Sequence, residues 1–203
     1  MSLVTLVSGG VDSALMALLA HDEGLVQHPL FIDYGQRAGK LEWMACQRVF
    51  RAHGLPRATR MNLSGFGRNV PSGLTRRDQD VFDDAFLPGR NLLFLLAGAA
   101  FASRRGAKAV AIGLLNERQS LFPDQSRDFL AKAEGLLRIS TSSSVALIAP
   151  LIDLDKAAVL KLAEQRGIRS TYSCHSGTVR PCGRCVSCRE RAAAQNEGGN
   201  HGR

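Results

Sequence analysis

The heptapeptide Val7-Ser-Gly-Gly-Val-Asp-Ser13 is the stretch from which the fold and the chemistry of this chain are predicted. It follows a short apolar run, residues 3–7, that predicts a buried strand, and it leads into residues 13–21, which have helical spacing. Two adjacent glycines let the backbone turn tightly and let an oxyanion approach the amides. The N–H groups and the positive dipole end of the next helix point to the same place. The stretch therefore predicts a phosphate-binding loop.

The residues after the glycines distinguish this loop from two common phosphate-binding loops. A Walker loop needs Lys and then Ser or Thr after its last glycine, and a dinucleotide-binding loop needs a third glycine; both are absent here. The stretch resembles the SGGxDS signature of the PP-loop ATP pyrophosphatases, which cleave ATP between its α- and β-phosphates. The alternative is an ordinary Gly-rich turn in which Ser or Asp caps the helix.

The PP-loop resemblance implies both a nucleotide site and a metal. Asp12 is expected to position Mg²⁺, because a hard carboxylate oxygen is the ligand that Mg²⁺ prefers. The residues of the loop implied to bind ATP are Val7, Ser8, Gly9, Gly10, Val11, Asp12 and Ser13.

Strand-like and helix-like segments alternate along the rest of the chain. Further strands are predicted at 29–33, 58–63, 108–112 and 145–149, and helices at 39–53, 91–105, 126–137 and 155–166. Strands separated by helices imply parallel crossovers, so we expect an α/β fold with a parallel sheet and helices on both faces. Residues 64–89 lack a sustained period and predict a long loop, which in a compact domain is functional or mobile.

Length and composition predict one α/β domain with a small appendage. We expect the domain to span residues 1–170, a metal-binding segment to span 171–195, and a polar, Gly-rich disordered tail to span 196–203. No apolar run is long enough for a membrane span and no signal peptide precedes the first strand, so we expect a cytoplasmic protein. The net charge is +8, but the basic residues are scattered, and we do not expect nucleic acid to be the partner.

Four of the five cysteines lie close together, in the pattern C-x7-C-x2-C-x2-C. In a chain without a secretion signal this clustering favours a metal over disulfides. Four thiolates fill a tetrahedral Zn²⁺ shell and leave no position for a catalytic water, which predicts a structural zinc site. The spacing also permits an iron–sulfur cluster. The predicted ligands are Cys174, Cys182, Cys185 and Cys188, while Cys46 is expected to be a buried, inert thiol.

Several further motifs together resemble the QueC family of PP-loop enzymes. The resemblance spans nearly the whole chain to about residue 192 and rests on Asp33-Tyr-Gly-Gln36, Phe86-Leu-Pro-Gly-Arg-Asn91, Pro150-Leu-Ile-Asp-Leu-Asp-Lys156, Thr171-Tyr-Ser-Cys174 and Cys182-Gly-Arg-Cys-Val-Ser-Cys188. It implies the Rossmann-like fold of the adenine nucleotide α-hydrolases (the PP-loop, HUP-like type).

The resemblance also implies a reaction and its partners. The family makes 7-cyano-7-deazaguanine on the route to queuosine. ATP activates the carboxylate of 7-carboxy-7-deazaguanine, ammonia gives the amide, and a second activation gives the nitrile. Arg90 and Asn91 are implied to act with Asp12 in catalysis, and Tyr34, Gln36 and Gly113 to bind ATP. We also expect a homodimer, and the apolar segment 91–102 fits either a core or an interface.

Three departures from the family pattern favour a second hypothesis. Ala38 stands where the family usually has His, Phe122-Pro-Asp-Gln-Ser126 stands where it has a segment like YPDCR, and 64–89 is shorter than usual. These changes lie where the deazaguanine or the amine is handled. The alternative enzyme couples the activated acid to an amine of a partner protein, as proposed for QueC-like proteins in anti-phage (CBASS-type) operons. A third hypothesis is a transfer-RNA modifying enzyme that uses the basic surface and the zinc segment.

Overall fold

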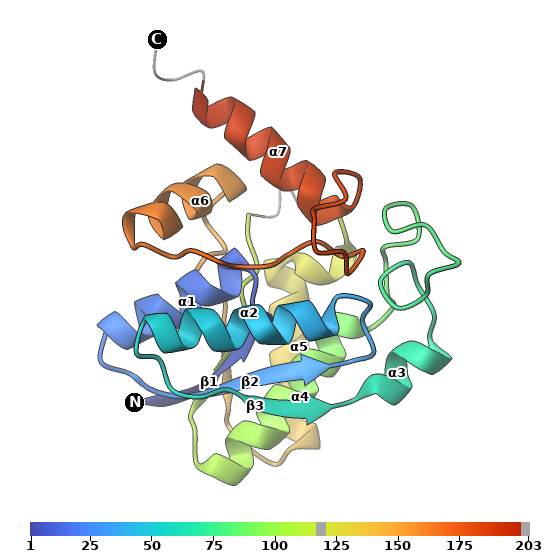
Figure 1. The fold of residues 1–203 in the computed structure, drawn as a ribbon. Helices are drawn as coiled ribbons and strands as arrows, with labels where there is room; N and C mark the ends of the chain where they lie inside the picture. Colours follow the sequence, from blue (N-terminus) through green and yellow to red (C-terminus); the bar gives the residue numbers. More distant parts are fainter. Residues whose placement is uncertain (117–120, 200–203) are drawn as a thin grey trace.

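The computed structural model describes residues 1–116 and 121–199, which form one layered α/β fold (Figure 1). Its five strands are all parallel and lie in the order β3-β2-β1-β4-β5. They span β1 (Ser2–Val7), β2 (Val26–Asp33), β3 (Thr59–Asn62), β4 (Ala109–Ala111) and β5 (Ala146–Ile148). The predicted parallel sheet is confirmed.

Helices cover both faces of this sheet. One face carries α1 (Val11–Asp22), α2 (Gly39–Ala52) and α6 (Lys156–Gln165), and the other carries α4 (Arg90–Arg105) and α5 (Arg127–Ser140) (Figure 1). Successive side chains of β1 pack on opposite faces of the sheet: Leu3 packs with α1 and α2, and Val4 packs with α4. Because both faces are buried at the centre of the sheet, β1 and β4 are nearly continuous apolar runs rather than alternating ones.

Two sequence predictions need correction. β2 begins at Val26 rather than at Pro29, because residues 26–28 pair in register with the start of β1. The long loop predicted over 64–89 begins with a short helix, α3 (Ser64–Asn69). At Gly67 the chain approaches the backbone of Tyr34 so closely that a Cβ would lie 2.3 Å from the Tyr34 carbonyl oxygen. A period-based search does not detect a helix of six residues held by such a contact.

The apolar helix α4 has both a buried and an exposed side. Leu95, Ala99 and Ala102 are buried in the core. Leu92 and Leu96 are 37% and 42% exposed. The segment is therefore a core element, and the homodimer stays a prediction.

The chain ends in a helix that lies beyond α6. This helix, α7 (Val186–Gly199), packs against α6 and continues into the segment for which the sequence predicted disorder; residues 200–203 lie outside the described part of the chain (Figure 1). None of the helices in the described ranges is long and apolar enough to cross a bilayer.

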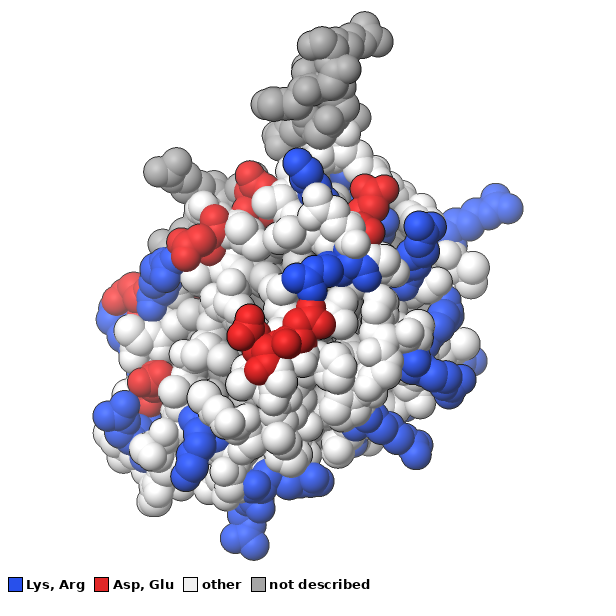
Figure 2. Space-filling view, turned by 90° about the vertical axis from the view of Figure 1, so that its left-hand side faces the viewer, with Lys and Arg blue, Asp and Glu red and all other residues white. Residues whose placement is uncertain are grey.

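Charge is dispersed over the face drawn in Figure 2. Lysine and arginine side chains lie around it, with acidic and uncharged side chains between them. This face offers no continuous basic stripe of the kind that follows a nucleic-acid backbone.

The strand order creates a crevice beside β1. The connection after β1 leads to β2 on one side of it, while β4 lies on its other side. The strand order therefore reverses between β1 and β4, at their carboxyl ends. Open parallel sheets bind ligands at this kind of switch point. The heptapeptide 7–13 lies there, at the end of β1 and the start of α1.

The turn between β1 and α1 requires glycine at position 9. Gly9 has φ +84°, and a Cβ there would lie 2.2 Å from the Glu42 carbonyl oxygen of α2. The Gly9 carbonyl oxygen also accepts a hydrogen bond from the Tyr172 amide at 2.9 Å. The loop is thus held between α2 and the C-terminal segment.

Gly9→Ala is expected to destabilise the protein by more than Gly54→Ala. Both glycines have positive φ, but a Cβ at Gly54 (φ +65°) meets nothing within 4 Å. Gly54→Ala should cost about 1 kcal/mol of unfolding free energy, from backbone strain alone, and Gly9→Ala at least about 2 kcal/mol more, because α2 must move. Urea unfolding followed by circular dichroism measures the difference; equal losses would contradict the tight approach of α2.

Candidate functional site

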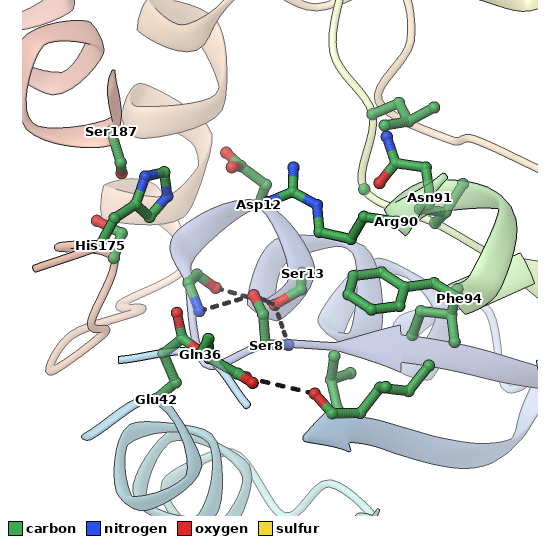
Figure 3. A pocket seen from close by; sticks show the side chains of 18 of the residues that line it. Ser8, Asp12, Ser13, Gln36, Glu42, Arg90, Asn91, Phe94, His175 and Ser187 are labelled. Atoms are coloured by element: carbon green, nitrogen blue, oxygen red, sulfur yellow. Dashed lines mark hydrogen bonds between the residues drawn. The ribbon is translucent and has the colours of Figure 1, made fainter. Parts of the chain in front are cut away.

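A cavity opens at the carboxyl ends of β1, β2 and β4, where segments far apart in the sequence meet (Figure 3). The heptapeptide forms its floor, α4 and the β2–α2 connection form two walls, and the segment around the cysteine cluster covers it. Of the ATP-binding and catalytic residues implied by the sequence, the cavity is lined by Val7, Ser8, Gly10, Asp12, Ser13, Tyr34, Gln36, Arg90, Asn91 and Gly113.

Two implied residues, Gly9 and Val11, do not line the cavity. Gly9 is covered by the backbone of α2, and Val11 is buried in the core with 7% exposure. Their side of the loop shapes the turn, and the opposite side faces the cavity.

The loop presents the start of α1 to the cavity without a side-chain cap. The N-cap residue is Gly10, and the first bond within the helix runs from the Ala14 amide to the Gly10 carbonyl oxygen at 3.1 Å. The amides before Ala14 have no acceptor within the helix. The Ser8 amide and hydroxyl lie 3.1 and 3.2 Å from the Ser13 hydroxyl, which fixes both hydroxyls beside this helix end. The alternative of a Ser- or Asp-capped turn therefore does not describe this helix.

The Asp12 carboxylate pairs with a lysine from the other end of the sequence. Lys156 Nζ donates to both carboxylate oxygens, at 2.7 and 2.8 Å, and the two side chains are 10% and 28% exposed. Lys156 is the first residue of α6, where Asp155 caps the helix by accepting from the Ala158 amide. The sequence singled out Lys156 only as part of a family motif, and its distance of 144 residues from Asp12 hid the pair.

The wall after β2 is built by the side chain of Gln36. Its Oε1 accepts from the Tyr34 amide at 2.9 Å, and its Nε2 donates to Glu42 Oε2 at 3.0 Å (Figure 3). Tyr34 is 8% exposed, its ring centroid lies 5.3 Å from that of Phe94, and burial raises the pKa of its phenol to about 12. Tyr34 is thus a neutral packing residue that also lines the cavity.

Arg90 and Asn91 start α4 at the opposite wall. The Arg90 side chain extends into the cavity, and its charge lies near Tyr34 and Glu42 (Figure 3). Asn91 is 5% exposed, and its Nδ2 donates to the Asp124 carbonyl oxygen at 2.9 Å. That bond ties the turn at 123–125 to α4, so Asn91 shapes the cavity rim as well as lining it.

The covering segment places a half-buried histidine, His175, near the positive charges of Arg90 and Lys156. Burial, with Arg90 and Lys156 nearby, lowers the pKa of His175 to about 4, so its imidazole is neutral at pH 7. Its Nδ1 is buried and has no hydrogen-bond partner in the part of the chain described. Ser187 and Glu190, from α7, line the same cavity. The sequence analysis did not select these residues as site residues, because they lie in or next to the segment that was assigned a structural role as a metal site.

The four clustered cysteines form a site of the size of one metal ion. Sγ atoms of Cys174, Cys182, Cys185 and Cys188 all lie within 4.8 Å of one another. Ligands about 2.3 Å from a tetrahedral Zn²⁺ lie roughly 3.8 Å apart, so the spacing fits a single ion. Cys46 is fully buried elsewhere in the core, and burial raises the pKa of its thiol to about 12, which confirms the predicted inert thiol.

The loop after α3 packs on this cysteine cluster. Val81 is fully buried against Cys174 and Cys185, and the Arg189 guanidinium lies 3.8 Å from the centroid of the Phe82 ring. Within 64–89, the segment expected to be functional or mobile, residues 81–82 therefore pack against the cysteine cluster, while Leu74, Ala85 and Leu87 pack in the main core.

Comparisons with known proteins agree with this geometry. A family model described as "Queuosine biosynthesis protein QueC" matches residues 2–199. Relatives named 7-cyano-7-deazaguanine synthase include one from Methanosarcina mazei, 29% identical over 96% of this chain and 93% of its own, and one from Chromobacterium violaceum, 35% identical over 97% and 89%.

This chain belongs to the QueC family. Among solved structures, NMN synthetase from Francisella tularensis is similar over 97% of this chain and 76% of its own, with a TM-score of 0.56 and 14% identity. That similarity shows the PP-loop fold.

The structure locates two of the three sequence departures from the QueC pattern. Ala38 is 2% exposed and lies outside the lining of the cavity, beside Gly177. Ser126 caps α5 by accepting from the Phe129 amide at 3.1 Å. Arg127 is 58% exposed and pairs with Asp153, so it does not place a positive charge in the cavity.

Lys156→Ala should lower the free energy of unfolding by about 1–3 kcal/mol, because it leaves the partly buried Asp12 carboxylate without its cation. Lys161→Ala, on the exposed side of the same helix, is the matched control and should change it by less than about 0.5 kcal/mol. Urea unfolding at pH 7 measures both. Equal effects would show that the Asp12–Lys156 pair does not stabilise the fold.

Cys185→Ala should abolish binding of one metal ion per chain. Cys46→Ala should retain it, because Cys185 is one of the four clustered cysteines and Cys46 is not. Metal analysis of the purified proteins gives the stoichiometry and identifies zinc or iron. Hydrogen exchange should then show lost protection around Val81 and Phe82 in Cys185→Ala, with β1 and β2 still protected. Unchanged exchange around Val81 would contradict the packing of this part of the loop on the metal site.

Proposed function

We propose that this protein is an ATP-dependent C–N ligase that converts 7-carboxy-7-deazaguanine and ammonia, through the amide, into 7-cyano-7-deazaguanine. The observation that carries the proposal is the uncapped start of α1, flanked by Ser8 and Ser13, in one cavity with Lys156 and Arg90. Helix N–H groups, hydroxyls and two cations together suit a polyphosphate. Membership of the QueC family supports the product.

The triphosphate is proposed to lie on the amides of the loop, with Arg90 and Lys156 balancing its charge. Asp12 is the proposed ligand of Mg²⁺, which would neutralise the charge of the phosphates when bound. In the free protein Lys156 holds that carboxylate in place. A bound phosphate gives Lys156 a second anion to contact.

The first half of the reaction is activation and amide formation. A substrate carboxylate oxygen attacks the α-phosphorus of ATP, the bond to the β-phosphate breaks, and pyrophosphate leaves. Ammonia then attacks the acyl carbon, AMP leaves with its oxygen, and a proton is released. The protein supplies positioning and charge stabilisation, because the loop amides are fixed before the substrate binds.

The second half repeats the activation on the amide. The amide oxygen attacks the α-phosphorus of a second ATP, pyrophosphate leaves, and loss of AMP and of both N–H protons gives the nitrile. One product therefore requires two ATP molecules, and both carboxylate oxygens end on AMP. One cavity serves both activations, because the attacking atom is an oxygen on the same carbon.

The cysteine cluster is proposed to hold a structural Zn²⁺ with no position for substrate. Its neighbours in sequence, His175 and Ser187, line the cavity, and the Tyr172 amide bonds to Gly9. The metal thus fixes one wall of the site.

A partner-protein amine is the second candidate acceptor. The observation that favours it is that Ser126 caps α5 and that Arg127 pairs with Asp153 at the surface, so that neither lines the cavity. This part of the chain, where the amine is expected to be handled, therefore departs from the family pattern. Intact-mass analysis of proteins encoded beside this one, after co-expression, would reveal an added deazapurine. Unmodified neighbours together with efficient nitrile formation would reject it.

The main test uses 7-carboxy-7-deazaguanine carrying ¹⁸O in both carboxylate oxygens, with ATP, Mg²⁺ and ammonium. Mass spectrometry should find the nitrile and two AMP per nitrile, each with one ¹⁸O, and Asp12→Asn should slow AMP release by about 10²-fold or more. The outcome that sinks the proposal is unlabelled AMP, or label in inorganic phosphate.

A further inference from the structure

One charged side chain in the cavity has no part in the phosphate chemistry above. Glu42 lies in the first turn of α2, half-buried, at the wall opposite Arg90 (Figure 3). Its Oε2 accepts from Gln36 Nε2 at 3.0 Å. Because Gln36 also bonds to the Tyr34 amide and the Ile32 carbonyl oxygen, it cannot turn away, and it fixes the direction of the Glu42 carboxylate.

Holding a carboxylate at this wall is unfavourable in the free protein. Burial raises the pKa of Glu42 to about 7, with the nearby charge of Arg90 lowering it and that of Asp33 raising it. A half-buried acceptor with one fixed donor is stabilised by a ligand that brings further N–H donors. The free protein therefore holds this acceptor ready for a ligand.

The chemistry of Glu42 excludes several ligands at this wall. A carboxylate repels a phosphate, and the N1 edge of adenine combines a donor with an acceptor, which a carboxylate cannot pair. The ring N–H and the adjacent 2-amino group of a guanine-type base are two donors side by side, and they match the two oxygens of a carboxylate. The apolar side chains of Ile32 and Phe94 in the same cavity offer contact to a flat ring.

We propose that Glu42, positioned by Gln36, is the specificity-determining residue that binds the N1–H and 2-amino edge of the 7-deazaguanine substrate. This inference rests on the proposed function, and it gives that function its base selectivity. The carboxylate accepts both hydrogen bonds, so the substrate is held by its ring while its 7-substituent is left to react at the phosphate side.

The test is binding of two probes by calorimetry: 7-cyano-7-deazaguanine and its analogue without the 2-amino group. The wild-type protein should bind the first about 10- to 100-fold more tightly, as a bidentate pair to a base edge provides. Glu42→Gln should bind both probes equally weakly, because its amide presents a donor to a donor edge. Its affinity for ATP with Mg²⁺ should stay within about threefold of wild type. Glu23→Gln, an exposed glutamate after α1, is the matched control.

A second readout needs only the wild-type protein. Because the ionised carboxylate binds, and its pKa is about 7, affinity for 7-cyano-7-deazaguanine should fall roughly tenfold from pH 8 to pH 6. Arg90 from α4, Asp33 and Tyr34 after β2, and Tyr172 from the covering segment are the charged and titratable groups around it. Glu42→Gln should lose this pH dependence.

Four outcomes overturn the inference. Equal wild-type affinity for the two probes does so, as does a Glu42→Gln variant that still discriminates between them. A variant that loses ATP binding instead would assign Glu42 to the cation, and one that binds normally without turnover would assign it to proton transfer. A wild-type protein that binds ATP but no 7-deazaguanine would overturn the proposed function itself.

Discussion

The amides at the start of α1 have no acceptor inside the helix, and Gly10 offers no side chain to cap them. Contacts with the surrounding structure hold the loop so that these amides stay uncapped and face the cavity. Gly9 takes a positive φ under the backbone of α2, and its carbonyl oxygen is held by the Tyr172 amide. β4 lies beside β1 on the other side, so that Gly113 also faces the start of α1. An anion is the ligand that such a helix end accepts.

The C-terminal segment completes the cavity from a distance in sequence. Lys156 starts α6 and pairs with Asp12, and the cysteine cluster directs His175 and Ser187 inward. Without the cluster, the loop around Val81 would also lose its packing. The segment around the cysteine cluster and the loop 7–13 thus border the same cavity, although the proposed zinc takes part in no chemical step.

Local pattern predicts the sheet, most helices, the phosphate loop and the metal ligands, because each follows from residues within one segment. The diglycine at 9–10 and the cysteine spacing are of this kind. The Asp12–Lys156 pair joins residues 144 apart, and no local period records it. Glu42 occupies a polar position of an amphipathic helix, so its direction into the cavity depends on Gln36 and on how α2 packs. The short helix α3 was missed for a similar reason, since its close approach to Tyr34 at Gly67 is a contact between distant segments.

The most direct test of this account is a crystal structure of the protein with a non-hydrolysable ATP analogue and Mg²⁺. The account predicts the β- and γ-phosphates on the amides at the start of α1, within hydrogen-bond reach of the Ser8 and Ser13 hydroxyls, and the α-phosphorus open to the cavity between Arg90 and Lys156. A nucleotide bound elsewhere, with the glycine turn and the start of α1 free of phosphate, would contradict it.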